Sequence, residues 1–210
     1  MIEKKMKKVN LLKTLSIITL LALCAGRSYA DETELPQRLG AEVDPTVSIT
    51  KSMSSVETGT INVETGANSG VLCVFNISTN GNDDDYDFYL SSTFPIDGEA
   101  RSAYDGNGNI IFGNVSNPPS EAAVTNAIAG GTNNKNVIMY PVTVTVGNPM
   151  TVSTTTHATY GNCYKVLLNG AQEGSLTHTV GAAPVTNTYI LSQDASGTYR
   201  ATVTLTAIAK

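Results

Sequence analysis

Residues 199–207 read YRATVTLTA, and apolar and polar side chains alternate strictly through this stretch. A period of two is typical of a β-strand that buries one face and exposes the other to water. We therefore predict a strand here. Its apolar face consists of Tyr199, Ala201, Val203, Leu205 and Ala207.

A similar alternation occurs near the N-terminus, between Glu34 and Thr50. Pro36 and Pro45 interrupt it, and proline is tolerated mainly at sheet edges or between strands. The pattern indicates either two consecutive strands or an extension that leads into a first strand. Its apolar residues are Leu35, Leu39, Ala41, Val43, Val47 and Ile49.

The chain between these ends is rich in Thr, Val, Asn and Gly, which favour strands and turns. One short helix is predicted over 121–129, with Ser120 as its N-cap and Gly130 as its stop. We expect an all-β protein: an immunoglobulin-like, pilin-type β-sandwich with one short helix, formed by residues 46–210. Further strands are expected over 61–63, 71–77, 86–90, 137–146, 150–159, 164–168 and 186–191.

The first thirty residues have the layout of a secretory signal peptide. Five lysines between Lys4 and Lys13 precede an apolar run, Leu15 to Ala25, which is too short to anchor the chain across a bilayer. Ser28 and Ala30 supply the small residues of a cleavage site. We predict a signal peptide over 1–30, an N-terminal extension over 31–45 and no transmembrane anchor; a lipoprotein modified at Cys24 and an N-terminal core helix are the alternatives.

Charge excludes two classes of partner. Residues 1–30 hold six of the 13 Lys and Arg residues and one of the 18 Asp and Glu residues, so the exported part carries 7 basic and 17 acidic side chains, a net charge of −10. Such a surface repels nucleic acid and anionic lipid, because it has no basic stripe to displace their counterions.

Two cysteines, Cys73 and Cys163, remain after Cys24 leaves with the signal. In an exported protein such a pair usually forms a disulfide, so we predict a Cys73–Cys163 bond. Two buried thiols are the alternative.

No pattern in the sequence indicates an enzyme, a cofactor or a metal site. The two histidines, His157 and His178, have no metal-ligand partner at short spacing. The sequence lacks a Gly-x-Ser-x-Gly elbow, a phosphate-binding loop and a His-Glu-x-x-His motif. The acidic residues 83–87 and the turn at 105–109 offer oxygen ligands for Ca²⁺, but their spacing matches no EF-hand loop, and solvated turns are the favoured interpretation.

The two chain ends resemble one family. Residues 196–205, SGTYRATVTL, are similar to the ending of chaperone–usher pilins, both the spore-coat-protein-U-like class and the alpha-class (colonisation-factor type) fimbrial major subunits. Residues 41–47, AEVDPTV, resemble the segment in which the donor extension of alpha-class subunits meets the first strand. The cysteine pair and the 105–135 region depart from that family.

This resemblance implies a structural subunit of a bacterial surface fimbria with a role in adhesion. Such subunits lack the last strand of the sandwich, and a neighbour's N-terminal extension fills the groove by β-augmentation. The donor side chains would be Leu35, Leu39, Ala41 and Val43, and the acceptor strand would be 199–207. Partners would be neighbouring subunits, a periplasmic chaperone, an outer-membrane usher and a host receptor. The alternative is a self-contained secreted or periplasmic module that binds a ligand or carbohydrate, with the N-terminal segment paired inside its own sheet.

Overall fold

The computed structural model describes residues 45–52, 67, 71–97, 99–132, 134–188, 190 and 192–210. All of these residues belong to one compact unit, Asp44–Lys210. The predicted signal peptide and the donor residues Leu35, Leu39, Ala41 and Val43 lie outside the described residues. No helix in the described part of the chain is long and apolar enough to cross a membrane.

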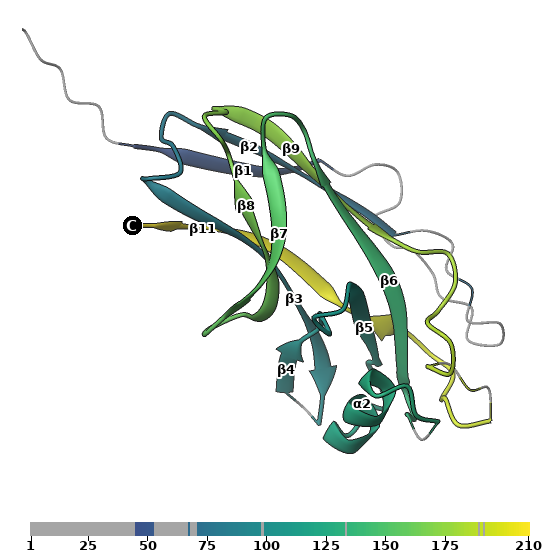
Figure 1. Cartoon of the computed structure of the whole chain (residues 1–210). Helices are drawn as coiled ribbons and strands as arrows, with labels where there is room; N and C mark the ends of the chain where they lie inside the picture. Colours follow the sequence, from purple (N-terminus) through teal and green to yellow (C-terminus); the bar gives the residue numbers. More distant parts are fainter. Residues whose placement is uncertain are drawn as a thin grey trace, which may run out of the picture. The chain divides into compact units, whose positions relative to one another are not determined.

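The protein is all-β, as the sequence predicts, and consists of two antiparallel sheets (Figure 1). The six-stranded sheet has the order β1 (Val47–Ser52), β2 (Val71–Thr79), β9 (Glu173–Val180), β6 (Val137–Val146), β5 (Asn109–Asn114) and β10 (Tyr199–Arg200). The second sheet has the order β11 (Thr202–Ala209), β3 (Tyr86–Ile96), β8 (Gly161–Leu167) and β7 (Thr151–His157), with β4 (Glu99–Ser102) also paired to β3.

The core lies where the inward faces of the two sheets meet. Ile77 and Leu176 from the six-stranded sheet pack in the same cluster as Phe88, Leu90 and Val166 from the second sheet, and each of these side chains is at most 2% exposed. Alternation explains the arrangement, because every second residue of a strand points to the same face. One contiguous cluster therefore holds both sheets together.

Strand β6 shows two patterns of burial, and its sequence explains both. Its first half is a continuous apolar run, and residues 137–140 are all buried. This half pairs with β5 and packs against the helix α2 (Glu121–Ile128). After Pro141 the strand alternates Val and Thr, pairs with β9 and exposes its threonines. A continuous apolar run is typical of a strand covered on both faces, and an alternating one of a strand covered on one face.

The predicted helix is confirmed with its caps. The Ser120 hydroxyl accepts a hydrogen bond from the amide of Ala123 at 3.3 Å. Gly130, two residues after the helix, has a φ of +73°, which glycine adopts without strain. The helix thus begins and ends where the local sequence predicts.

Two expectations about strands were wrong. Residues 199–207 do not form one strand: β10 pairs with β5 in the six-stranded sheet, whereas β11 pairs with β3 in the second sheet. The chain changes sheets at Ala201. The described residues of 186–191 form turns, and the hydroxyl of Thr188 donates to the carbonyl of Val185 at 2.7 Å. The composition of the segment 186–191 resembles that of a strand, but local side-chain hydrogen bonds favour the turn.

A close approach of β5 to β3 gives a first prediction. A Cβ added at Gly113 would lie 2.5 Å from the carbonyl oxygen of Pro95. Because a backbone atom cannot move aside cheaply, we expect Gly113→Ala to lower the free energy of unfolding by about 1–3 kcal/mol, measured by chemical denaturation. Gly147→Ala is the matched control, since nothing lies within 4 Å of its added Cβ. Equal stabilities of the two variants would contradict this explanation of Gly113.

Candidate functional site

Strand β11 forms one edge of the second sheet. Among the described residues it pairs on one side only, with β3, in the register Thr202↔Thr93 to Ala209↔Tyr86. The strand has eight residues and no charged side chain or proline. Charges, prolines and short length are the usual means of protecting a sheet edge. Within the described residues the other side of the β11 backbone has no strand partner, and an edge of this kind is a template for pairing with another strand.

The inward face of β11 is apolar and only partly covered. Leu205 is buried in the core, whereas Val203 and Ala207 are half-buried and pack against its margin. Thr202 and Thr204 point the other way and are exposed. The alternation predicted from sequence is thus the alternation observed. By contrast, β7 at the opposite edge of the sheet has a single apolar residue, Val152, in its seven positions.

The other two residues of the predicted acceptor strand lie elsewhere. Tyr199 belongs to β10, is 8% exposed, and donates its hydroxyl to the carbonyl of Ala195 at 2.8 Å. Ala201 lies at the change of sheet and packs against the core. The continuous apolar face along the open edge therefore consists of Val203, Leu205 and Ala207.

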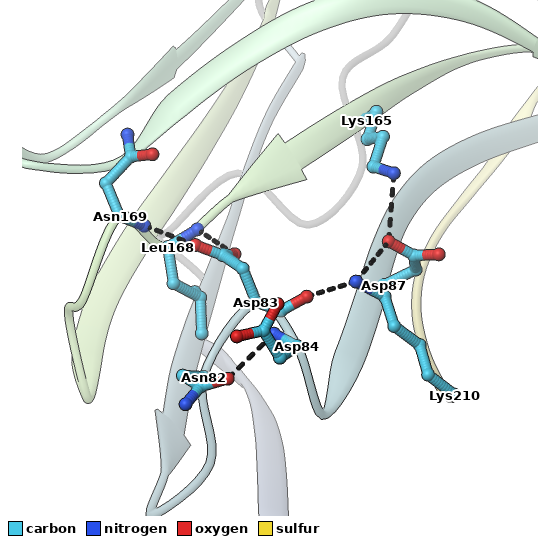
Figure 2. A network of polar contacts seen from close by, with 8 residues as sticks. All are labelled: Asn82, Asp83, Asp84, Asp87, Lys165, Leu168, Asn169 and Lys210. Carbon is cyan, nitrogen blue, oxygen red and sulfur yellow. Dashed lines mark hydrogen bonds and ion pairs between the residues drawn. The ribbon is translucent and has the colours of Figure 1, made fainter.

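The end of β11 is fixed by a polar network, which Figure 2 shows from close by. The backbone amide of Lys210 donates to the carbonyl of Asp85 at 3.1 Å. Its ammonium group donates to the carbonyl oxygen of Asp83 and lies 3.4 Å from the carboxylate of Asp87. Asp87 also pairs with Lys165 at 2.9 Å. These contacts hold the last residue of the chain against the loop between β2 and β3.

The start of β1 is bound to the same loop. The amide of Asn80 donates to the carbonyl of Thr46 at 3.2 Å, and the hydroxyl of Thr79 donates to that carbonyl at 2.6 Å. The hydroxyl of Tyr86 donates to the carbonyl of Pro45 at 2.8 Å. The residues before β1 and the end of β11 thus meet at one corner, defined here as the 79–87 segment with Pro45, Thr46 and Lys210.

The acidic residues of this corner bind groups of the protein itself. The two carboxylate oxygens of Asp83 accept from the amides of Leu168 and Asn169 at 2.7 and 2.8 Å (Figure 2). The ion pair with Lys165 holds the pKa of Asp87 below its usual value, and Lys210 contributes to the same shift. Within the described residues no cluster of three acidic, cysteine or histidine side chains is arranged to hold a metal ion.

The predicted Cys73–Cys163 disulfide is not formed, and strand geometry gives the reason. Cys73 lies on β2 with its side chain on the inward face, packed against the core. Cys163 lies on β8, where its neighbour Tyr164 joins the core cluster and Cys163 does not. Because successive side chains of a strand point to opposite faces, Cys163 lies on the outer face of its sheet. The two thiols are on opposite sides of the second sheet.

A buried polar group that sequence reasoning missed lies between the sheets. His178 on β9 is fully buried, and neither ring nitrogen has a hydrogen-bond partner. Burial lowers the pKa of His178 to about 4. Its ring centroid is 6.0 Å from that of Tyr104, whose hydroxyl also lacks a partner and whose pKa is raised by burial. The sequence contains a signal for this burial, because His178 alternates in step with Leu176 and Val180, whose side chains point inward from the same strand.

A hollow of about 220 Å³ opens beside the start of β8. Tyr104, Cys163 and Tyr164 are among the residues that line it, and burial raises the pKa of the Cys163 thiol and of both tyrosine hydroxyls. They are therefore protonated at neutral pH and offer no thiolate or phenolate nucleophile. Asn162, at the rim, uses its side chain internally, because it accepts from Thr156 and donates to the carbonyl of Tyr104.

No family model matches the chain, and no curated protein sequence matches it.

Proposed function

We propose that this chain is a structural subunit of a bacterial surface fimbria that polymerises by accepting a neighbour's strand along β11. The observation that carries the proposal is the open edge of β11, uncharged along its length, with Val203 and Ala207 half-buried on its inward face. An added strand would pair with the edge and cover these side chains, which is the geometry of β-augmentation. Export through the periplasm, a chaperone, an usher and adhesion to a host receptor follow from the fimbrial role.

The order of strands supports this proposal. An immunoglobulin-type sandwich places strands A, B, E and D in one sheet and strands C, F and G in the other. Here β1, β2, β9 and β6 are neighbours in that order in one sheet, and β3 pairs with β11 in the other. Taken in chain order, β1, β2, β3, β6, β9 and β11 correspond to A, B, C, D, E and F. The place of strand G is the open side of β11.

The direction of the strands favours a donor from another molecule. Strand β11 runs toward the corner that contains Pro45 and Lys210, and Pro45 is the residue to which the segment 31–44 is joined in the sequence. If this segment folded back along β11 of its own domain, it would run parallel to β11. A neighbour's segment can pair antiparallel, which is slightly more stable per residue and matches every strand pairing described in this domain.

A complementation experiment tests the proposal. We expect a variant that lacks residues 31–43 to fold but not to polymerise, and a peptide of residues 31–45 to bind it and raise its melting temperature. Matched peptides separate the two faces of the segment: Leu39→Asp should abolish binding, because it places a charge in an apolar groove, and Arg38→Asp should not. A full-length protein that stays monomeric, with a truncated form that ignores the peptide, would favour the self-contained module.

A further inference from the structure

Three aromatic rings gather on the outer face of the second sheet, away from the core. Tyr89 lies on β3, His157 ends β7, and Tyr160 lies in the turn between β7 and β8. The ring centroid of His157 is 4.7 Å from those of both Tyr89 and Tyr160, and its plane is only 22° from that of Tyr160. Tyr89 and Tyr160 are 6.1 Å apart. We call these three residues the aromatic platform.

The parity of the strands sets this position. Phe88 and Leu90 are fully buried in the core, so Tyr89 between them points outward. On β8, Lys165 has the outward parity, lies opposite Tyr89 in the register, and places its ammonium group 5.7 Å from the Tyr89 ring centroid. The platform therefore spans β3, β8 and β7 on a face that the core does not use.

The turn at 157–161 holds the rings in place. The amide of Thr159 donates to Nδ1 of His157 at 3.2 Å. In a neutral ring the proton is then on Nε2, which is left as a donor. Gly161 has a φ of +66°, which closes the turn at little cost because glycine has no Cβ. Tyr160, His157 and Tyr89 are all half-buried, so each keeps part of its surface open to solvent.

We propose that the aromatic platform binds the apolar face of a neutral pyranose sugar. A pyranose presents C–H groups on one face and hydroxyls around its edge. The aromatic rings supply a rigid apolar surface for the C–H groups. The sugar hydroxyls can form hydrogen bonds with the tyrosine hydroxyls, the His157 Nε2–H, and Ser153 and Thr155 of β7. A small number of placed polar groups around an apolar surface is the general character of such sites.

Charge directs the site to a neutral sugar. The cation beside the platform, Lys165, is paired with Asp87 at 2.9 Å, so its charge is already compensated. The exported part of the chain carries a net charge of −10, which repels sialylated or sulfated glycans. A neutral hexose or N-acetylhexosamine is not repelled by this charge and does not need an unpaired cation.

The platform is separate from the edge that the proposed function uses. Strand addition covers the inward face and the open edge of β11, whereas the rings lie on the outward face and centre on β8. Substitutions in the aromatic platform are therefore expected to weaken sugar binding without affecting polymerisation, and substitutions on the inward face of β11 to do the reverse. The inference does not depend on the fimbrial proposal, because an isolated domain presents the same platform.

The test uses the purified full chain and an array of neutral oligosaccharides that end in galactose, glucose or N-acetylglucosamine, with sialylated forms of each. We expect binding to neutral glycans, loss of about tenfold or more in affinity with Tyr160→Ala, and near-complete retention with Tyr160→Phe, because the ring provides the contact. Leu167→Ala is the matched control: Leu167 is 37% exposed on the same strand face and lies outside the platform.

Nuclear magnetic resonance with the best-binding neutral sugar gives a second readout. The ring signals of Tyr89, His157 and Tyr160 should shift on titration in the unmodified chain. Three results would each overturn the inference: no binding to any neutral glycan, equal affinity of the Tyr160→Ala variant, or binding restricted to the sialylated forms.

Discussion

Replacing Val203 by aspartate is expected to prevent the proposed assembly into fibres while leaving a folded subunit. Val203 points inward from β11, opposite Ser92 of β3, and is half-buried at the margin of the core. In the isolated subunit the new carboxylate can still reach water past the open edge. Once a donor strand lies along that edge, the carboxylate has no access to water and no partner, and an uncompensated buried charge costs several kcal/mol.

The expected result is a loss of on the order of a hundredfold or more in the affinity for a donor strand. Thr204→Asp is the matched control, because Thr204 is the next residue of the same strand and its side chain is exposed on the outward face. Electron microscopy and gel filtration report assembly, and the melting temperature reports folding. Fibres formed by both variants alike would show that the inward face of β11 is not the acceptor surface.

Local patterns predicted several strands of this fold but missed β9, and both outcomes have a physical reason. Whether a side chain points inward depends only on its parity along a strand, so alternation at 203–207 predicts burial correctly without knowledge of the partner strand. Likewise, the caps at Ser120 and Gly130 act within a few residues, and the helix appears where they place it.

Features that depend on which strands pair could not be predicted from the sequence. Nothing within residues 199–207 signals that Tyr199 pairs in one sheet and Val203 in the other, because sheet membership is decided by β5 and β3, which lie far away in the sequence. The cysteine prediction failed for a related reason. Composition and compartment indicated a bond, but the faces on which Cys73 and Cys163 lie follow from the registers of two different sheets.

The candidate site was predicted in part. The apolar side chains Val203, Leu205 and Ala207 were found from sequence, since an alternating strand displays them directly. That this strand forms an open edge, and that its end meets the start of β1 at one corner, required the pairing of β11 with β3 and the contacts of Lys210. The aromatic platform was missed because Tyr89 on β3 is far in sequence from His157 and Tyr160.

The second large expected effect is a loss of stability in acid caused by His178. The side chain is fully buried between the sheets, and its ring nitrogens have no hydrogen-bond partner in the described structure. Burial lowers its pKa in the folded protein to about 4, compared with about 6.5 in an unfolded chain. Between these two values the unfolded state binds a proton that the folded state does not, so stability is lost as the pH falls from 6.5 toward 4.

The predicted contribution is about 3 kcal/mol between pH 7 and pH 4, because each unit of pKa difference is equivalent to about 1.4 kcal/mol. His178→Leu removes the titrating group and retains an apolar side chain of similar size. Other carboxylates also titrate in this range, including Asp87, whose pKa is lowered by Lys165, and Asp194, whose pKa is raised by burial. Since both proteins contain them, the difference between the two stability curves isolates the histidine. Urea denaturation at several pH values should give curves that converge or cross as the pH rises, with the variant favoured in acid. Parallel curves would mean that the pKa of His178 is the same in the folded and unfolded states. The ring would then have access to water, in contradiction to its complete burial between the sheets.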